Sequence, residues 1–216
     1  MEVNAPRPDS GALALNEIWW RPQDIHRTID LMLTHETWGP RIDRSKISVA
    51  GFSLGATAAL SVAGAELDAA RYMRSCAADS KREAPDCGWY AAQGTDLSET
   101  DPVGLAGLAR DPRITSVIAV NPEYLADLSP PPADVSVLRI ALGNPDGKSD
   151  EKIAQAVVIR GASAFDAFPV CTAAGPDILI EEDGDASLCG ASTETRQAIH
   201  QEISEAIIAF LKHDAE

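Results

Sequence analysis

Ser53 is the residue of this chain whose surroundings most clearly predict chemistry. It lies in Gly51-Phe52-Ser53-Leu54-Gly55, a G-x-S-x-G pattern between a β-prone run and a run of small, helix-forming residues. A strand, a sharp turn and a helix in this order are typical of a nucleophile elbow, which exposes a serine hydroxyl. We expect the two glycines, which lack a Cβ, to let strand and helix approach closely. The pattern predicts Ser53 as nucleophile and the backbone N–H of Leu54 as an oxyanion donor; a plain Gly/Ser turn is the alternative.

The elements that must position this serine alternate between helices and strands. Residues 11–20 are expected to be irregular, and a helix is expected to begin at Arg21, with Pro22 in its first turn, and to end near His35. The further expected helices are 56–63, 65–78, 150–155 and 193–212, and the expected strands are 47–50, 114–120, 135–142 and 156–160. Such alternation predicts an α/β fold, a mostly parallel sheet flanked by helices.

Four cysteines fall into two local pairs, Cys76 with Cys87 and Cys171 with Cys189. Without a C-x-x-C or a nearby histidine, no metal site is predicted. The even count and the pairing across loops favour two disulfides and an oxidising compartment, and four separate buried thiols are the alternative. The first pair belongs to a long excursion at about 76–100, which either caps the site or forms a disulfide-held surface loop.

Net charge and the lack of certain motifs argue against several classes of partner and ligand. The chain has 216 residues, a net charge of −15 and a pI near 4.6, which argues against nucleic acid and against anionic membrane surfaces. No stretch approaches the ~18 apolar residues of a membrane span, and no signal peptide is visible. There is no P-loop and no G-x-G-x-x-G, so no cofactor is predicted. We expect a single domain over residues 1–216.

Several motifs occur in the order found in one family of bacterial enzymes. They are Arg21-Pro22-Gln23-Asp24, the elbow, Cys76…Cys87, Asp111-Pro112-Arg113-Ile114 and Phe165-Asp166-Ala167-Phe168-Pro169-Val170-Cys171. From about Trp20 onward the chain resembles the dienelactone hydrolase-like α/β hydrolases, which are related to the platelet-activating-factor acetylhydrolases. The resemblance implies an α/β-hydrolase fold, cleavage of small, acetyl or lipid esters by a serine, an acid and a histidine, and a periplasmic or secreted location.

The catalytic histidine of that family has no counterpart in this chain. It is expected in the loop after the last strand, where the family pattern resembles Ser-His-Phe and this chain has Ser163-Ala164-Phe165. Position 164 has therefore lost the base. Loss of one member of such a triad costs on the order of 10⁴ in rate, so an impaired hydrolase is expected.

The acid has two possible places. In the acetylhydrolase arrangement it follows the strand that ends at Val120, where this chain has Asn121 with Glu123 nearby. In many other α/β hydrolases it follows the next strand, where Asp146 stands in a G-x-x-D. Asp146 is the predicted acid, and a turn residue in Asn-Pro-Asp-Gly is its alternative.

The first strands of the full hydrolase fold are missing before Ser53, and so is the His-Gly loop that supplies the second oxyanion donor. We expect either an N-terminally truncated form of an exported protein or a genuine short form, which would be cytoplasmic. In both cases the elbow strand is expected to have an exposed edge, which invites a protein partner or self-association. The two resulting hypotheses are a serine esterase of reduced activity and a non-catalytic pseudo-hydrolase that binds a partner.

Overall fold

The computed structural model describes residues 11–77, 87–143, 156–181 and 185–213. The α-helices are α1 (Gly11–Ala14), α2 (Glu17–Thr34), α3 (Leu54–Val62), α4 (Ala69–Met73), α5 (Cys87–Ala92), α6 (Pro102–Ala106), α7 (Gly175–Glu181) and α8 (Thr193–His213). The strands are β1 (Ile47–Phe52), β2 (Ile114–Val120), β3 (Ser136–Leu142) and β4 (Ala156–Ile159). Short 3₁₀ helices are η1 (Gly39–Arg41), η2 (Leu97–Glu99), η3 (Leu125–Asp127), η4 (Ala164–Ala167) and η5 (Ala186–Cys189).

The four strands form one parallel sheet in the order β1-β2-β3-β4. The predicted α/β class is confirmed, and every strand pair in the described sheet is parallel. The apolar run of β2 is buried along almost its whole length, as a central parallel strand requires. Phe52 at the end of β1 lies beside Val120 at the end of β2. The segments that follow these two strands therefore emerge side by side.

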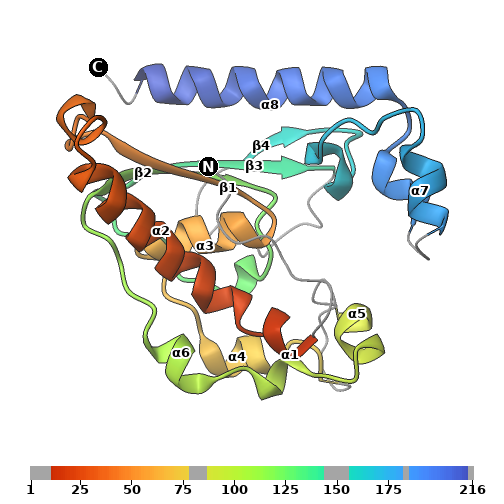
Figure 1. Cartoon of the computed structure of the whole chain (residues 1–216), viewed down its shortest axis with the longest axis horizontal. Helices are drawn as coiled ribbons and strands as arrows, with labels where there is room; N and C mark the ends of the chain where they lie inside the picture. Colours follow the sequence, from red (N-terminus) through yellow and green to blue (C-terminus); the bar gives the residue numbers. More distant parts are fainter. Residues whose placement is uncertain (1–10, 78–86, 144–155, 182–184, 214–216) are drawn as a thin grey trace.

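Helices cover both faces of the sheet, as Figure 1 shows: α8 lies across one face, and α2 and α3 lie across the other. The core between α3 and the sheet is built from small and β-branched side chains such as Ala59 and Val117, and Ile25 and Ile29 of α2 pack against it. On the opposite face, Ile199 of α8 packs against the strands. None of the described helices is long and apolar enough to cross a membrane.

A third cluster packs the excursion beside the elbow. Tyr90 of α5 and Tyr72 of α4 are buried together with Tyr124, and Leu54 of the elbow packs against them. The predicted disulfides are confirmed. Cys76 bonds Cys87, 11 positions further along the chain, and Cys171 bonds Cys189, 18 positions further along. Two disulfides point to an oxidising compartment.

The expected start of the first long helix was wrong. α2 begins at Glu17 rather than at Arg21, and Pro22 lies inside the helix. The segment expected to be irregular contains α1 and the first turn of α2. An ion pair between Glu17 and Arg21, one turn apart, and the burial of Ile18 favour the longer helix.

The helix expected over 65–78 is reduced to α4. Backbone bonds to a neighbouring segment keep its first residues extended: the Asp68 N–H donates to the Asp127 carbonyl (2.8 Å), and the Glu66 N–H donates to the Ser129 hydroxyl (2.8 Å). The Asp68 carboxylate then accepts from the Arg71 N–H and caps α4. Tertiary contacts therefore overrode the local helical preference.

The last helix extends one residue beyond the expected end, to His213. Ser192 caps it, because its hydroxyl accepts from the Thr195 N–H (3.1 Å). Leu211, near the end of this helix, is 38% exposed. The short helix expected over 150–155 lies outside the described residues.

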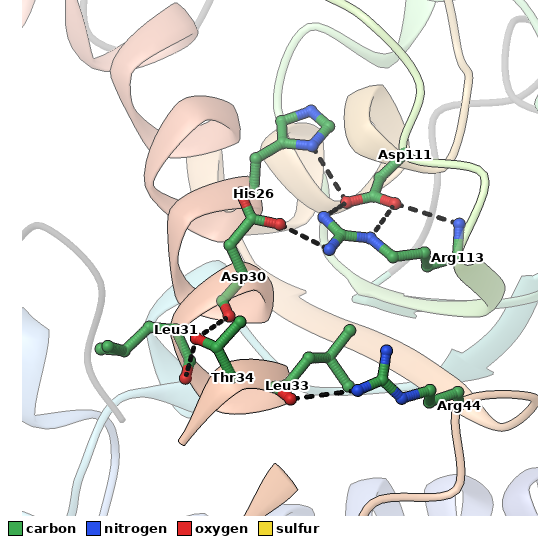
Figure 2. Close-up of polar contacts among 8 residues, drawn as sticks. All are labelled: His26, Asp30, Leu31, Leu33, Thr34, Arg44, Asp111 and Arg113. Atoms are coloured by element: carbon green, nitrogen blue, oxygen red, sulfur yellow. Dashed lines mark hydrogen bonds and ion pairs between the residues drawn. The ribbon is translucent and has the colours of Figure 1, made fainter. Parts of the chain in front are cut away.

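A charged network fastens α2 to the loop before β2 (Figure 2). The buried Asp111 carboxylate accepts from Arg113 Nε (2.8 Å) and from His26 Nδ1 (3.0 Å), and Arg113 also bonds Asp30 of α2. The Arg113 guanidinium lowers the pKa of Asp111 to about 2 against the opposing effect of burial, and Arg113 itself has its pKa raised by this carboxylate. The network fixes α2 against the sheet that carries the elbow.

Candidate functional site

Ser53 lies at the predicted strand–turn–helix junction, between the last residue of β1 and the first residue of α3. Its φ of 55° and ψ of −126° place it in a region that non-glycine residues rarely adopt. Gly51 is required there, because a Cβ on it would overlap the carbonyl group of Gly55. The close approach expected of both glycines holds for Gly51 only: a Cβ at Gly55 would meet nothing within 4 Å.

Strained backbone is concentrated at this junction. In the described part of the chain, Ser53, Asn121 and Tyr124 are the non-glycine residues with positive φ. Ser53 follows β1, and the other two follow β2, so all three lie where the neighbouring strands end. Each such residue costs about 1–3 kcal/mol and persists only where its surroundings hold it, which is typical of functional sites.

The side chain of Ser53 donates a hydrogen bond to the Glu123 carboxylate. The two residues are 70 positions apart in the sequence and meet because β1 and β2 are parallel neighbours. The Ser53 N–H also donates to the Val120 carbonyl (3.0 Å). Thr57 of α3 donates from its hydroxyl to the backbone carbonyl of Glu123 (2.6 Å) and fixes that residue's backbone beside the elbow.

Aromatic packing also holds the segment that carries Glu123. The ring of Tyr124 meets the ring of Tyr72 edge to face, with centroids 4.8 Å apart. Both side chains are buried, and Tyr90 of the excursion is buried in the same cluster. The Cys76–Cys87 disulfide links the segment just after α4, which carries Tyr72, to the start of α5, which carries Tyr90. The excursion at about 76–100 therefore contributes to the packing around the site.

No histidine bonds Ser53, although all four lie in the described part of the chain. His26 bonds the Asp111 carboxylate, and His200 bonds the Phe168 carbonyl (3.0 Å). The other two lie at the ends of α2 and α8. Among the described residues, the group that accepts the hydrogen bond of the Ser53 hydroxyl is a carboxylate.

The loop in which the family's histidine is expected is held by ring packing and by contacts with a buried arginine. Position 164 begins η4 and carries an alanine. The ring of Phe168, just after η4, meets the Phe52 ring edge to face at 5.2 Å, so this loop lies against the elbow strand. Buried Arg196 of α8 approaches Asp166 of η4 at 3.7 Å and donates to the Pro169 carbonyl (2.9 Å).

The residue predicted to supply the oxyanion donor, Leu54, is described, and the predicted acid is outside the described residues. Leu54 is the first residue of α3, where a backbone N–H has no acceptor within the helix. Asp146 lies in the segment 144–155, outside the described residues. Glu123, which the sequence suggested only as a carboxylate near Asn121, is the carboxylate that the structure brings to Ser53. The adjacency of parallel strands is the signal that could have identified it.

Two grooves flank β1. One, of about 350 Å³, lies between β1 and α2 and is lined by Ile25 and Val49; the other, of about 400 Å³, lies towards α8 and is lined by Phe52 and His200. In the described part of the chain β1 pairs only with β2, so the expected exposed edge is confirmed there.

Comparisons with protein-family models, curated proteins and solved structures found no match for this chain. The resemblance to dienelactone hydrolases thus rests on the motifs alone.

Proposed function

We propose that this protein is a serine hydrolase that acts on carboxylic esters, with Ser53 as its nucleophile. The observation that carries the proposal is the strained elbow, which puts the Ser53 hydroxyl at the start of α3 and against the Glu123 carboxylate. An activated serine needs a proton acceptor and an oxyanion donor within reach. We assign these two roles to Glu123, which accepts from the Ser53 hydroxyl, and to the N–H of Leu54, the first residue of α3.

Small esters, including acetyl and lipid esters, are the proposed substrates. The resemblance to dienelactone hydrolases and acetylhydrolases supports this class. Phe165 and Phe168 support it too: each is more than one third exposed, and they stack at 6.1 Å beside the Phe52 ring. An apolar acyl or alcohol group would find contact surface there. A periplasmic or secreted location is proposed with it, in line with the disulfides.

Turnover is expected to be slow. The family's histidine is replaced by Ala164, and no described strand precedes β1 to supply a second oxyanion donor. One missing oxyanion donor alone costs about 10²–10³ in rate. The proposal is therefore an esterase of reduced rate rather than an efficient one.

Hydrolysis of p-nitrophenyl acetate by wild type and by Ser53→Ala tests the proposal. Wild type is expected to release p-nitrophenol faster than Ser53→Ala, because only the serine can be acylated at the elbow. Ser45→Ala, a serine-to-alanine change at an exposed position in the loop before β1, is the control and should behave as wild type. Equal rates for wild type and Ser53→Ala would refute the proposal.

A second candidate is a non-catalytic interaction protein on the same scaffold. The exposed edge of β1, with a groove on each face, is the observation that favours it. An added strand would bond the edge and place alternate side chains in the two grooves. Ester turnover that depends on Ser53 would count against this candidate as the sole function.

A further inference from the structure

We propose that Glu123 is a catalytic residue that takes the proton of Ser53 directly, in place of a histidine. The inference rests on the proposed function and goes beyond it by assigning the base. The inference is based on the hydrogen bond that Ser53 Oγ donates to Glu123 Oε1 in the described part of the chain.

The placement of Glu123 is built into the fold. Its backbone carbonyl accepts from the Thr57 hydroxyl (2.6 Å), and its chain neighbour Tyr124 is buried with a φ of 52°. Two residues earlier, Asn121 has a φ of 47°, and its N–H donates to the Ile140 carbonyl (2.7 Å). These contacts hold the carboxylate where the serine hydroxyl points.

The histidines offer no competing base. His26 has both ring nitrogens bonded, one to the Asp111 carboxylate and one to the Ala109 carbonyl (3.1 Å). His200 bonds the Phe168 carbonyl on the α8 face of the sheet. Because every histidine lies in the described part of the chain and none bonds Ser53, the proton acceptor at the elbow is the glutamate.

The proposed reaction balances without any further reactant except water. As Ser53 Oγ forms a bond to the ester carbonyl carbon, its proton passes to Glu123, and the Leu54 N–H donates to the oxyanion. The bond to the alcohol oxygen then breaks, and the alcohol leaves with the proton from Glu123. Water attacks the acyl-serine and gives its proton to Glu123, the bond to Oγ breaks, and the proton returns to Ser53.

A carboxylate base predicts a distinctive pH profile. Carboxyl groups ordinarily lose their proton near pH 4, whereas imidazolium loses it near about 6.5. The rate of Ser53 acylation is therefore expected to be level between about pH 5.5 and 7.5, whereas a histidine base would give an inflection in that range. A carboxylate is also the weaker base, which agrees with slow turnover.

Single-turnover acylation by p-nitrophenyl acetate, measured across this pH range, tests the inference. Glu123→Gln keeps the shape of the side chain and an oxygen that accepts from Ser53, but it cannot take the proton. We expect it to lower the acylation rate by about 10²–10⁴-fold. Glu123→Asp should restore part of the rate, and Glu202→Gln, an equal charge change on the exposed side of α8, should leave it unchanged.

The outcomes separate this inference from the proposed function. If Ser53→Ala abolishes acylation and Glu123→Gln does not lower it, the proposed function stands and the assignment of the base is overturned. An inflection near pH 6.5 in the wild-type profile would also overturn it, in favour of a histidine. If wild type and Ser53→Ala do not differ, the proposed function fails first. A wild-type acylation rate that is level across this pH range, together with a lower rate in Glu123→Gln, supports Glu123 as the base.

Discussion

At the scale of single residues, the elbow depends on one glycine rather than two. The backbone of Gly51 passes so close to the first turn of α3 that a Cβ would overlap the carbonyl group of Gly55. Gly55 itself faces open space within the helix. The pattern G-x-S-x-G therefore contains one glycine needed for packing and one that the fold does not require.

This asymmetry predicts opposite effects of the same substitution. Gly51→Ala should lower the free energy of unfolding by about 1–3 kcal/mol, the usual cost of overpacking. Gly55→Ala should raise it by up to about 1 kcal/mol, because alanine is the better helix former. Urea denaturation of both variants beside wild type measures the difference. Equal losses in the two variants would contradict the close approach at Gly51.

The sequence predicts only part of the site, because some of its residues meet through strand pairing rather than through a local pattern. Ser53 and Leu54 come from a local pattern, and local patterns can be recognised along the chain. Glu123 reaches Ser53 only through the pairing of β1 with β2, which the sequence does not display directly. The sequence therefore favoured Asp146, whose motif is local, over the carboxylate that strand adjacency brings to the serine.

At the scale of elements, the network around Asp111 joins α2 to the strand that precedes the site. The folded-state pKa of Asp111 is about 2, below its ordinary 3.8. A lowered carboxyl pKa stabilises the fold above about pH 3.8, and this contribution disappears as the pH falls towards about 2. The Asp111 side chain is 1% exposed, so the shift corresponds to about 2 kcal/mol.

Asp111→Asn should therefore be less stable than wild type at neutral pH by about 2 kcal/mol, and the difference should shrink as the pH falls from about 4 to 2. Denaturant unfolding at several pH values measures it. Asp134→Asn removes a carboxylate from the exposed pair with Arg110 and should change stability little at any pH. A difference for Asp111→Asn that does not depend on pH would contradict this account.

The edge of β1 is the second feature at this scale. Exposed strand edges pair with other chains unless they are blocked, and a lysine on the edge blocks them. We expect wild type to associate as its concentration rises and Ala50→Lys to associate less, as measured by light scattering. Ala91→Lys, on an exposed position of α5, adds the same charge elsewhere and should associate as wild type does. Equal behaviour of the two variants would show that the edge does not drive association.

At the scale of the whole molecule, two disulfides cross-link segments that lie outside the sheet. Figure 1 shows α5 and α7 at the periphery, and each disulfide ends in or beside one of them. Closing loops of this length contributes about 3 kcal/mol per bridge in the loop-entropy description. Replacing Cys171 and Cys189 together by serine should lower the Tm by roughly 5–10 °C. Full reduction should remove the difference between variant and wild type; a Tm of wild type that reduction leaves unchanged would contradict a stabilising role.

The fold was easier to predict than the site. Continuous apolar runs such as 114–120 identify buried parallel strands, because few other structures accommodate them. The helix expected over 65–78 failed where backbone bonds to Asp127 and Ser129 kept its first residues extended. Helix boundaries and long-range side-chain contacts depend on partners that are distant in the sequence. A local sequence pattern does not show these partners.

The most direct test of the central claim is to locate the acetyl group after brief exposure of the protein to p-nitrophenyl acetate. We expect mass spectrometry of the digested protein to find the acetyl group on the peptide that contains Ser53, and we expect Ser53→Ala to leave this peptide unmodified. Acetyl groups found only on lysines, in equal amounts in wild type and Ser53→Ala, would contradict a nucleophilic serine at the elbow.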